Sequence, residues 1–395
     1  MPMLPAPITA ACVKAFALAS VAWLASSSLG QLTGPDQTPV AEFRFVDPLT
    51  TDPGIVDVEL PNAGDLDRDH VVATSRAEEP NGRLFVWISG SGATPGQYLE
   101  VTRTAAEQGY DAVGVVYASW PPVNDITTQN PDTELPELIR RERIFGEPFP
   151  GGSGVDPANG IENRLIKLLQ HQASAFPNER WTDYLTPTGG VDWSRIVVAG
   201  HSQGAGHSAY LGKIRRVAGV LIFGGPGDFV QGFGTAPWVI EPGITPPGRS
   251  LAFVHLDDAT APGFFFNQRI LGLNAFGDLQ GVDRRPASEL TSHMLTSGFP
   301  VPPGQTGHSA VCVDGRMPLN ADGSPRYEPV WAYMLTDIPC TADIDADGSL
   351  DASDVSDAVN EVANALPQAD WNGDASVDYF DIATYLQRLR ACESL

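Results

Sequence analysis

Basic residues are scarce in this sequence. Lys and Arg together number 24 against 48 Asp and Glu, which leaves a formal net charge of −24 at pH 7. A surface this negative repels phosphate backbones and anionic headgroups, so neither nucleic acid nor anionic lipid is expected as a partner. Hydrophobic residues make up 42% and charged residues 18% of the 395 positions, as in ordinary globular proteins with an ample core.

Long hydrophobic runs are also few, and the one at residues 15–25 (AFALASVAWLA) lies near the start of the chain. It follows Lys14 and precedes Ser28 and Gly30, the pattern of a secretory signal peptide cleaved after Gly30. The run is too short to span a bilayer comfortably, and no later segment is predicted to be transmembrane. We therefore expect residues 1–30 to be a signal peptide and the mature protein to be secreted or held at the cell surface.

Cysteine is limited to four residues. Export places the mature chain in an oxidising compartment, and cleavage of the signal peptide removes Cys12. Cys340 and Cys392 then bracket an acidic C-terminal segment, and a bridge between them would be worth about 4 kcal/mol through loop closure. Cys312 is left over, so either it is a buried free thiol or the pairing is different.

Short apolar runs alternate with helix-like segments from about residue 41 to residue 335, which indicates an α/β fold with a doubly wound, mostly parallel sheet. The predicted strands are 84–89, 112–118, 196–199, 217–223 and 251–255. The predicted helices are 98–108, 161–175, 202–215 and 287–296. Two Gly/Pro-rich segments, 120–160 and 224–249, interrupt the pattern and are expected to be loops over the site. We take residues 31–338 as one catalytic domain and residues 339–395 as a small second domain.

Gly200-His201-Ser202-Gln203-Gly204 is the only Gly-x-Ser-x-Gly pentapeptide in the chain. It follows a predicted strand and opens a predicted helix rich in small residues. A turn this tight forces its central residue into a strained conformation and needs glycine on both sides, where a Cβ would clash with neighbouring backbone. The serine hydroxyl is then held outward at a helix N-terminus, where a developing anion is favoured. The pattern predicts Ser202 as a catalytic nucleophile.

These residues resemble the α/β-hydrolase superfamily over about residues 83–335. The resemblance implies that the acid and the histidine follow the serine in that order. Asp258 is the predicted acid because it begins an Asp-x-x-x-Pro segment after the strand 251–255, with Asp257 and Asp228 as alternatives.

His308, late in the domain and in a predicted loop, is expected to take and return the serine proton. His293 is the competing residue, although it falls in the predicted helix 287–296. The remaining candidates, His201, His207 and His255, are expected to be packing residues near the site.

The resemblance also implies an oxyanion hole made of two backbone N–H groups. One is that of Gln203, the residue after the nucleophile. The other is expected in the turn Ser89-Gly90-Ser91-Gly92 after the first predicted strand, from Ser91 or Gly92.

The segment after residue 339 contains an acidic repeat with a period of 27 residues. Its spacing matches that of a calcium loop, which supplies six or seven oxygens to one ion. A helix-like stretch follows each copy. The predicted ligands of the first copy are Asp343, Asp345, Asp347, Ser349 (carbonyl), Asp351 and Asp354. Those of the second copy are Asp370, Asn372, Asp374, Ser376 (carbonyl), Asp378 and Asp381. The repeat predicts structural Ca²⁺, and no cofactor is expected for catalysis.

This duplication, with Asp at position 12 of each copy, resembles a type I dockerin over about residues 339–392. The resemblance implies a module that tethers an enzyme to a cohesin-like protein through positions 10 and 11. Those positions are Ala352-Ser353 and Tyr379-Phe380, which differ from each other, and Ala375 replaces the usual glycine at position 6 of the second copy. A purely structural calcium clasp is the alternative.

Together these features predict a secreted carboxylic ester hydrolase that works through an acyl-enzyme. Acylated polysaccharide or another polymer is the expected substrate class. Two alternatives stay open: a hydrolase-fold binding protein with a vestigial triad, and a serine peptidase or amidase. The cluster Arg140, Arg141 and Arg143 is interpreted as a solvated helix face, with binding of an acidic substrate as the other possibility.

Overall fold

The computed structural model describes residues 41–61, 68–77, 80–127 and 130–392. The predicted signal peptide, residues 1–30, and Cys12 lie outside the described residues. In the described part, no helix combines the length and the hydrophobicity that crossing a membrane requires.

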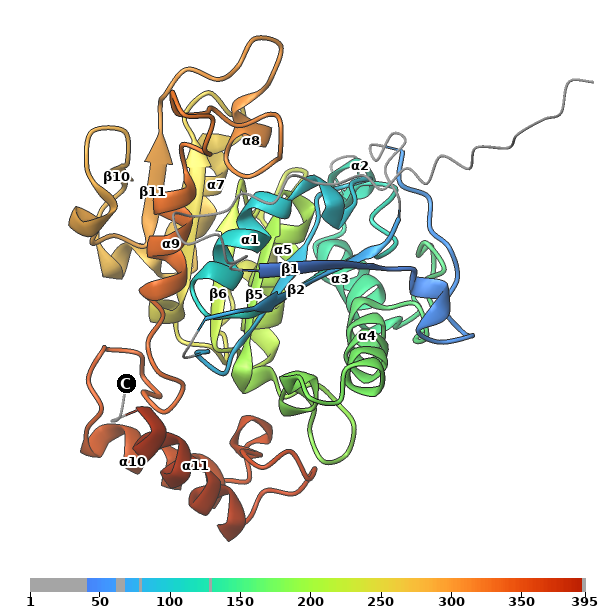
Figure 1. Cartoon of the computed structure of the whole chain (residues 1–395), viewed down its shortest axis with the longest axis vertical. Helices are drawn as coiled ribbons and strands as arrows, with labels where there is room; N and C mark the ends of the chain where they lie inside the picture. The colour runs from blue at the N-terminus through green and yellow to red at the C-terminus, as the bar shows by residue number, and fades with distance from the viewer. Residues whose placement is uncertain (1–40, 62–67, 78–79, 128–129, 393–395) are drawn as a thin grey trace, which may run out of the picture. The chain divides into compact units, whose positions relative to one another are not determined.

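A nine-stranded sheet forms the centre of the molecule, with the strand order β1-β2-β4-β3-β5-β6-β9-β11-β10 (Figure 1). The two pairings of β2 are antiparallel and the other six pairings are parallel. The structure therefore confirms a mixed α/β fold with a mostly parallel sheet. The strands are β1 (Ala41–Val46), β2 (His70–Ser75), β3 (Leu84–Ile88), β4 (Asp111–Val115), β5 (Ile196–His201), β6 (Gly219–Phe223), β9 (Ser250–His255), β10 (Gln280–Gly281) and β11 (Met294–Ser297).

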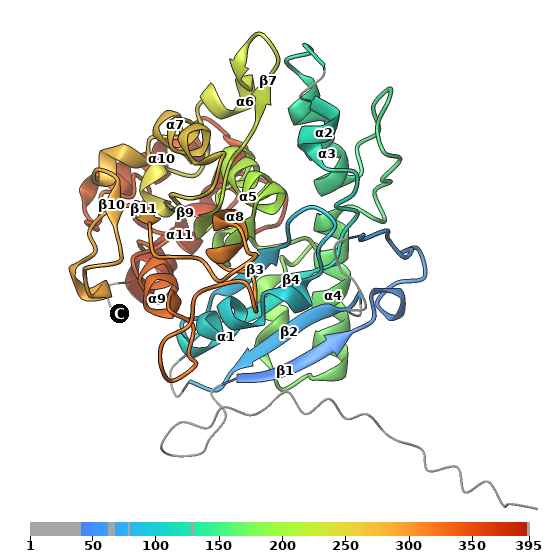
Figure 2. The ribbon, with the colours of Figure 1, turned by 90° about the horizontal axis from the view of Figure 1, so that it is seen from above.

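The five predicted strands correspond to β3, β4, β5, β6 and β9. Nearly all of their residues are buried, because helices cover the sheet on both faces. On one face, α4 (Ile161–Ala175) and α5 (Gln203–Ile214) pack on a core that contains Val86 and Val198. On the other face, α1 (Leu99–Glu107) and α9 (Glu328–Thr336) pack on a core that contains Trp87 and Phe253. Figure 2 shows α1 and α9 on the side of the sheet opposite to α5.

The predicted helix over residues 287–296 is wrong. Residues Ala287–Glu289 form a short 3-10 helix, and Met294–Ser297 form β11 between β9 and β10. This segment forms a strand and not a helix because all four residues of β11 are buried within the sheet. The other three predicted helices are confirmed as α1, α4 and α5.

The two Gly/Pro-rich segments carry short elements and not only loop. The first contains α2 (Val123–Thr127) and α3 (Leu135–Phe145). The second contains a small hairpin of β7 (Phe229–Val230) and β8 (Gly234–Thr235), followed by α6 (Pro237–Ile240). Both segments follow carboxyl ends of parallel strands, β4 and β6, and α2 contacts β7. They therefore lie side by side over the edge of the sheet at which Ser202 emerges.

Residues 339–392, called the tail below, form a helix pair with its own small core. Helix α10 (Ala352–Ala363) packs on α11 (Tyr379–Cys392) around Ile344, Trp371 and Tyr385. A disulfide joins Cys340 to Cys392, as predicted, with 6.0 Å between the two Cα atoms. Cys312 is a buried free thiol in the core beneath α9, which settles the alternative in favour of an unpaired cysteine.

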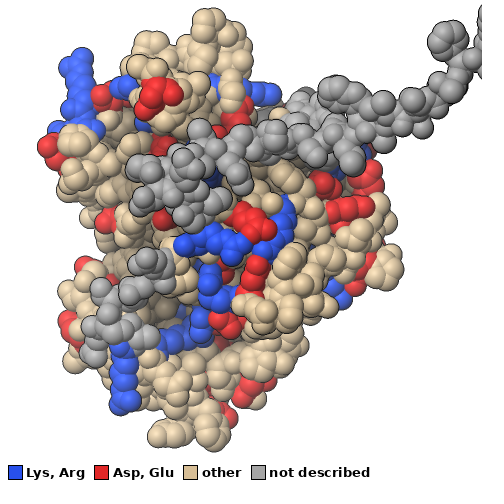
Figure 3. Space-filling view, viewed as in Figure 1, with Lys and Arg blue, Asp and Glu red and all other residues tan. Residues whose placement is uncertain are grey.

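Charged side chains of both signs mix on the face drawn in Figure 3. Basic groups there lie beside acidic ones. Ion pairs among the described residues include Arg103–Glu100 and Arg76–Glu42.

Candidate active site

Ser202 occupies a strained turn between β5 and α5. Its backbone has φ 57° and ψ −115°, in a region that residues with a side chain rarely adopt. Its amide donates to the carbonyl oxygen of Phe223 at the end of β6, with 2.9 Å between the two atoms. Ser202 is partly exposed, whereas the strand before it is buried. The turn thus presents the hydroxyl at the carboxyl edge of the sheet.

The glycines on either side of Ser202 are needed because backbone passes close to them. A Cβ on Gly204 would lie 2.0 Å from the carbonyl oxygen of Ile88, and one on Gly200 would lie 2.4 Å from the carbonyl carbon of Gly204. Real Cβ atoms do not approach backbone this closely. The pentapeptide is therefore dictated by how α5 packs against β3.

His308 and Asp258 are hydrogen-bonded partners in the structure. His308 Nδ1 lies 2.5 Å from Asp258 Oδ2, and Asp258 Oδ1 accepts from the amide of Thr260 at 2.9 Å. Burial raises the pKa of the Asp258 carboxyl, but its bonds to His308 and Thr260 outweigh burial and leave that pKa below the usual value. Asp258 is thus ionised near neutral pH and keeps a proton on His308 Nδ1, which leaves Nε2 able to accept one.

The alternative acids and the alternative histidine have other surroundings. Asp257 is exposed, and Asp228 is buried in a pair with Arg140. His293 stacks on Phe276, and its Nε2 faces Asp337 at 3.4 Å. None of these three contacts involves Ser202 or His308.

The segments that carry Ser202 and His308 meet beside Gly224 and Gly225. A Cβ on Gly224 would lie 3.3 Å from His308 Nδ1, and one on Gly225 would lie 3.3 Å from the carbonyl oxygen of Ser202. The hydrogen bonds among the described residues do not include one from the Ser202 hydroxyl to the His308 ring. Such bonds often form or tighten only when a substrate is bound.

His308 lies in the short helix α8 (Gly307–Ala310) and not in a loop as predicted. His201 links this helix to the glycine turn after β3. Its Nε2 lies 2.8 Å from the carbonyl oxygen of His308, which can only accept, so Nε2 carries the proton. Its Nδ1 then accepts from the hydroxyl of Tyr98 at 3.1 Å, and that hydroxyl oxygen accepts from the amide of Gly90 at 3.3 Å. Burial, and the neighbouring His308, lower the pKa of His201 to about 3, which keeps its ring neutral.

Gln203 directly follows Ser202, and its side chain is held by four hydrogen bonds. Its side-chain oxygen accepts from Ser91 Oγ at 3.0 Å and from the amide of Val123 at 2.9 Å. Its side-chain nitrogen donates to Tyr117 Oη and to the carbonyl oxygen of Ser119, each at 3.1 Å. All four hydrogen-bonding positions of this buried amide are filled. The residue whose backbone N–H is the predicted oxyanion donor is therefore held by two segments, the turn after β3 and residues 117–123 after β4.

The two candidates for the second oxyanion donor have different contacts. The amide of Gly92 donates to Ser119 Oγ at 2.9 Å and is used within the protein. Ser91 Oγ donates to Gln203 Oε1 at 3.0 Å, which ties the turn after β3 to the residue that follows Ser202.

The interpretation of Arg140, Arg141 and Arg143 as a solvated face is wrong for two of the three. Arg140 and Arg143 are buried, and only Arg141 lies at the surface, paired with Glu147. A buried guanidinium requires partners, and α3 brings these two against the start of α5 and the loop after β4.

Arg140 holds the helix that begins at Ser202. Its Nε donates to Asp228 Oδ2 at 2.6 Å, and one Nη donates to the carbonyl oxygen of Gln203 at 3.3 Å. Trp238 also donates to Asp228, at 2.7 Å. Sequence patterns gave no signal for this pair, because its two members are 88 residues apart.

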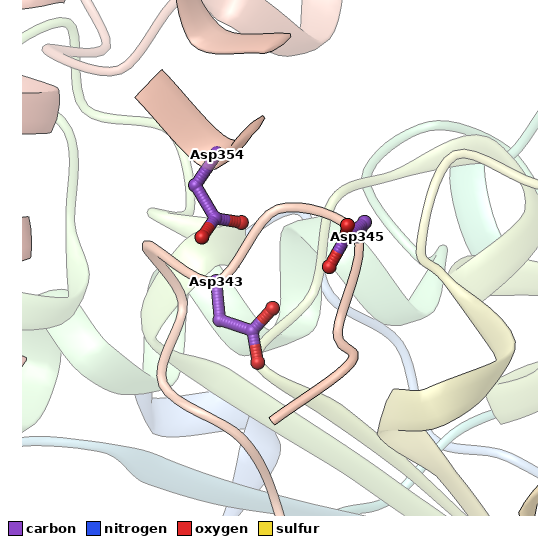
Figure 4. Close-up of side chains that lie close together, drawn as sticks. All are labelled: Asp343, Asp345 and Asp354. Atoms are coloured by element: carbon purple, nitrogen blue, oxygen red, sulfur yellow. The ribbon is translucent and has the colours of Figure 1, made fainter. Parts of the chain in front are cut away.

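The first acidic loop, residues 343–354, gathers three carboxylates (Figure 4). Asp343, Asp345 and Asp354 each offer an oxygen within 4.8 Å of the others. Asp343 Oδ1 is buried and has no hydrogen-bond partner, whereas Asp343 Oδ2 accepts from the amide of Gly348. A buried carboxylate oxygen without a donor suits a cation, so these residues fit Ca²⁺.

The first loop has three other predicted ligands, Asp347, Ser349 and Asp351, and they are not part of this three-carboxylate cluster. Asp347 and Asp351 side chains accept from the amides of Ser349 and Ser353 within the loop.

The second loop, residues 370–381, repeats the backbone of the first but not its carboxylate cluster. Position 6 is left-handed in both, at Gly348 (φ 90°) and Ala375 (φ 68°). In the second loop, Asp370 accepts from the amides of Gly373 and Ala375, and Asp381 accepts from that of Trp371. Among the described residues, only the first loop brings three carboxylates within reach of one ion. The other four predicted ligands of the second loop are not part of such a cluster either: Asn372, Asp374, Ser376 and Asp378.

No protein-family model matches the chain, the tail included, and no curated protein matches it. Solved structures with some likeness include esterase B from Lactobacillus rhamnosis with a tributyrin phosphonate inhibitor, at 12% identity over 60% of this chain and 72% of that one (TM-score 0.34). A mutant of esterase rPPE matches at 13% over 79% and 84% (TM-score 0.35). A thermophilic esterase from the Planctomycetes species Thermogutta terrifontis matches at 15% over 59% and 80% (TM-score 0.32). All three are esterases, and their TM-scores with this chain lie below 0.5.

Proposed function

We propose that this chain is a secreted serine esterase of the α/β-hydrolase type, with Ser202, His308 and Asp258 as its catalytic triad. One observation carries the proposal. A serine in a strained strand-to-helix turn lies at the same edge of the sheet as a histidine that is bonded to a buried carboxylate. This combination supplies a nucleophile, a base and the group that orients the base.

In the proposed reaction, the Ser202 hydroxyl attacks the ester carbonyl carbon while His308 Nε2 takes the hydroxyl proton. The carbonyl oxygen becomes an oxyanion, which the backbone N–H groups of Gln203 and Ser91 stabilise. His308 then returns the proton to the departing alcohol, and an acyl-serine remains. A water molecule then attacks the acyl carbon while His308 Nε2 takes its proton. His308 returns this proton to Ser202 Oγ as the bond from Oγ to the acyl carbon breaks and the acid leaves.

A fluorophosphonate probe tests this proposal directly. We expect the folded mature protein to be labelled and Ser202→Ala to lose labelling. Ser288→Ala, at an exposed serine in a 3-10 helix, serves as the matched control and should be labelled like the wild type. A folded wild type that stays unlabelled would favour the binding-protein alternative.

The substrate class needs a separate measurement. We propose carboxylic esters, among them acylated polysaccharides or other polymers. A panel of acyl esters, acetylated polysaccharides and peptide amides would separate this class from a peptidase or amidase. Cleavage of amides in preference to esters would reject the esterase assignment.

Export and calcium binding complete the proposal. Secreted protein should begin at Gln31 if residues 1–30 are a cleaved signal peptide. The first loop would hold Ca²⁺ through the predicted oxygens of residues 343–354, and the unpartnered Asp343 Oδ1 supports this. The second loop is proposed to bind more weakly. Calorimetric titration of the chain with Ca²⁺, compared with Asp343→Asn, measures both sites.

A cohesin-like partner is proposed on the tail's exposed surface. Tyr379 and Phe380, at positions 10 and 11 of the second loop, are 77% and 66% exposed. Loss of pull-down by a cohesin on Tyr379→Ala would support this partner, and no pull-down by the wild type would leave the tail a structural clasp.

A further inference from the structure

The tail lies against the edge of the sheet opposite to the proposed catalytic site. The residues that contact it come just before parallel strands: Arg83 before β3, Arg216 before β6 and Arg249 before β9. Ser202 and Asp258 follow β5 and β9 instead. Strands that run in parallel place their starts at one edge and their ends at the other. Contacts with the tail therefore act on the scaffold and do not cover the catalytic edge.

Arg249 joins the first acidic loop to β9. This fully buried residue donates from one Nη to the carbonyl oxygen of Cys340 at 2.8 Å and to that of Asp343. The neighbouring Gly248 is in close contact as well, because a Cβ there would lie 2.4 Å from the carbonyl oxygen of Ala346. The backbone of the first loop thus rests directly on residues 247–249.

The second loop is held in a similar way. Thr188 Oγ1 donates to the carbonyl oxygen of Gly373 at 3.1 Å, and a Cβ on Gly373 would lie 2.7 Å from Thr186. The guanidinium groups of Arg216 and Arg388 lie over the Trp371 ring, 5.3 and 5.4 Å from its centroid. Both loops therefore face the catalytic domain.

Two further ion pairs cross the same boundary. Arg216 pairs with Glu361 of α10, and Arg388 of α11 pairs with Asp192 at 3.1 Å. The described residues from Ala41 onward accordingly belong to one compact unit. The tail is therefore packed directly against the catalytic domain and is not an appendage on a flexible linker.

The contact between Arg249 and the first loop leaves polar atoms without a hydrogen-bond partner on both sides. Arg249 Nε and Nη1 are buried without a hydrogen-bond partner, and so is Asp343 Oδ1. Burying unpaired polar atoms is costly. A divalent cation in the loop would neutralise the carboxylates and fix the carbonyl groups to which Arg249 donates.

We propose that calcium in the first loop fastens the tail onto the catalytic domain through Arg249, so that calcium stabilises the hydrolase fold itself. The inference rests on the calcium binding proposed above and is independent of the esterase activity. A ligand that binds only the folded state stabilises it by mass action, and here the stabilisation reaches β9, which leads into Asp258.

Hydrogen exchange by mass spectrometry on the full mature chain, with calcium at about 100 times its Kd or with a chelator, tests this. In the wild type, calcium should slow exchange in residues 343–354 and also in residues 247–255. It should raise the Tm of the catalytic unit by about 5 °C. In Arg249→Met, calcium should still protect residues 343–354, but residues 247–255 should no longer respond.

Arg390→Ala is the matched control, because Arg390 is an exposed arginine of α11. It should keep the full response. If Arg249→Met does not fold, Arg216→Met, which removes the contact with Glu361, should weaken the response of residues 247–255.

The proposal would be overturned if calcium slowed exchange only in the tail of the wild type. It would also be overturned if calcium slowed exchange in residues 247–255 of Arg249→Met as much as in the wild type. Absence of any calcium response would overturn it together with the calcium assignment, whereas loss of fluorophosphonate labelling bears only on the esterase.

Discussion

The Nε2 atom of His201 donates to the carbonyl oxygen of His308 at 2.8 Å, so the residue before the proposed nucleophile holds the backbone of the proposed base. The same ring reaches the glycine turn after β3 through Tyr98. His201 is therefore a positioning residue that ties two parts of the site together.

Replacing His201 with Phe should slow fluorophosphonate labelling about tenfold. The change removes two hydrogen bonds, and it leaves the Tyr98 hydroxyl proton without an acceptor and the His308 carbonyl oxygen without this donor, at a cost of about 1–3 kcal/mol. His201→Gln, which keeps a donor near the position of Nε2, should recover most of the labelling rate. Equal labelling rates for His201→Phe and His201→Gln would show that the hydrogen bond from Nε2 to the His308 carbonyl oxygen does not contribute to labelling.

The stability of the fold should fall as the pH drops below about 6.5. Burial lowers the pKa of His70 and of His201 to about 3, and that of His207 well below its usual value. Between these values and the unfolded pKa of 6.5, the unfolded chain binds protons that the folded chain does not, so acid favours unfolding. Each histidine contributes a slope of about 1.4 kcal/mol per pH unit in that window.

Urea unfolding at pH 7 and pH 5 measures this slope. His201→Gln should reduce it by about one third, because two of the three buried histidines remain. A free energy of unfolding that does not change between these pH values would contradict the assignment of neutral buried rings.

Asp258→Asn should reduce labelling by about 10³–10⁴-fold with little change in fold. The amide would favour the wrong tautomer of His308 and could not stabilise its cation. Asp257→Asn, at the exposed neighbour, is the matched control and should label like the wild type. The reverse ranking would make Asp257 the acid.

The parts of this molecule that could be predicted from sequence are those with a local signal. Near-continuous apolar runs gave β3, β4, β5, β6 and β9, since parallel strands are buried on both faces. Strand β1 (AEFRFV) mixes polar and apolar residues at an edge, and β11 (MLTS) is four residues long. Neither has enough pattern to be distinguished from loop or helix.

The candidate site also has parts with a local sequence signal and parts without one. The pentapeptide around Ser202 and the Asp-x-x-x-Pro segment at Asp258 are local patterns, and the structure places Asp258 and His308 in contact. The contacts of Arg140 with Asp228, and of Arg249 with the tail, join residues about 90 positions apart. Those contacts depend on tertiary packing, which no local pattern records.

The two acidic loops offer a matched pair of substitutions at position 6. Ala375 has φ 68° and Gly348 has φ 90°, and a left-handed conformation costs a residue with a Cβ about 1–2 kcal/mol. Ala375→Gly should therefore stabilise the tail by about 1 kcal/mol and tighten calcium binding at the second loop. Gly348→Ala should have the opposite effect at the first loop, where a Cβ would meet no neighbouring atom, so only the backbone conformation is tested. Calcium titration and thermal unfolding of both variants measure the effect, and changes of the same sign in the two would refute a shared loop geometry.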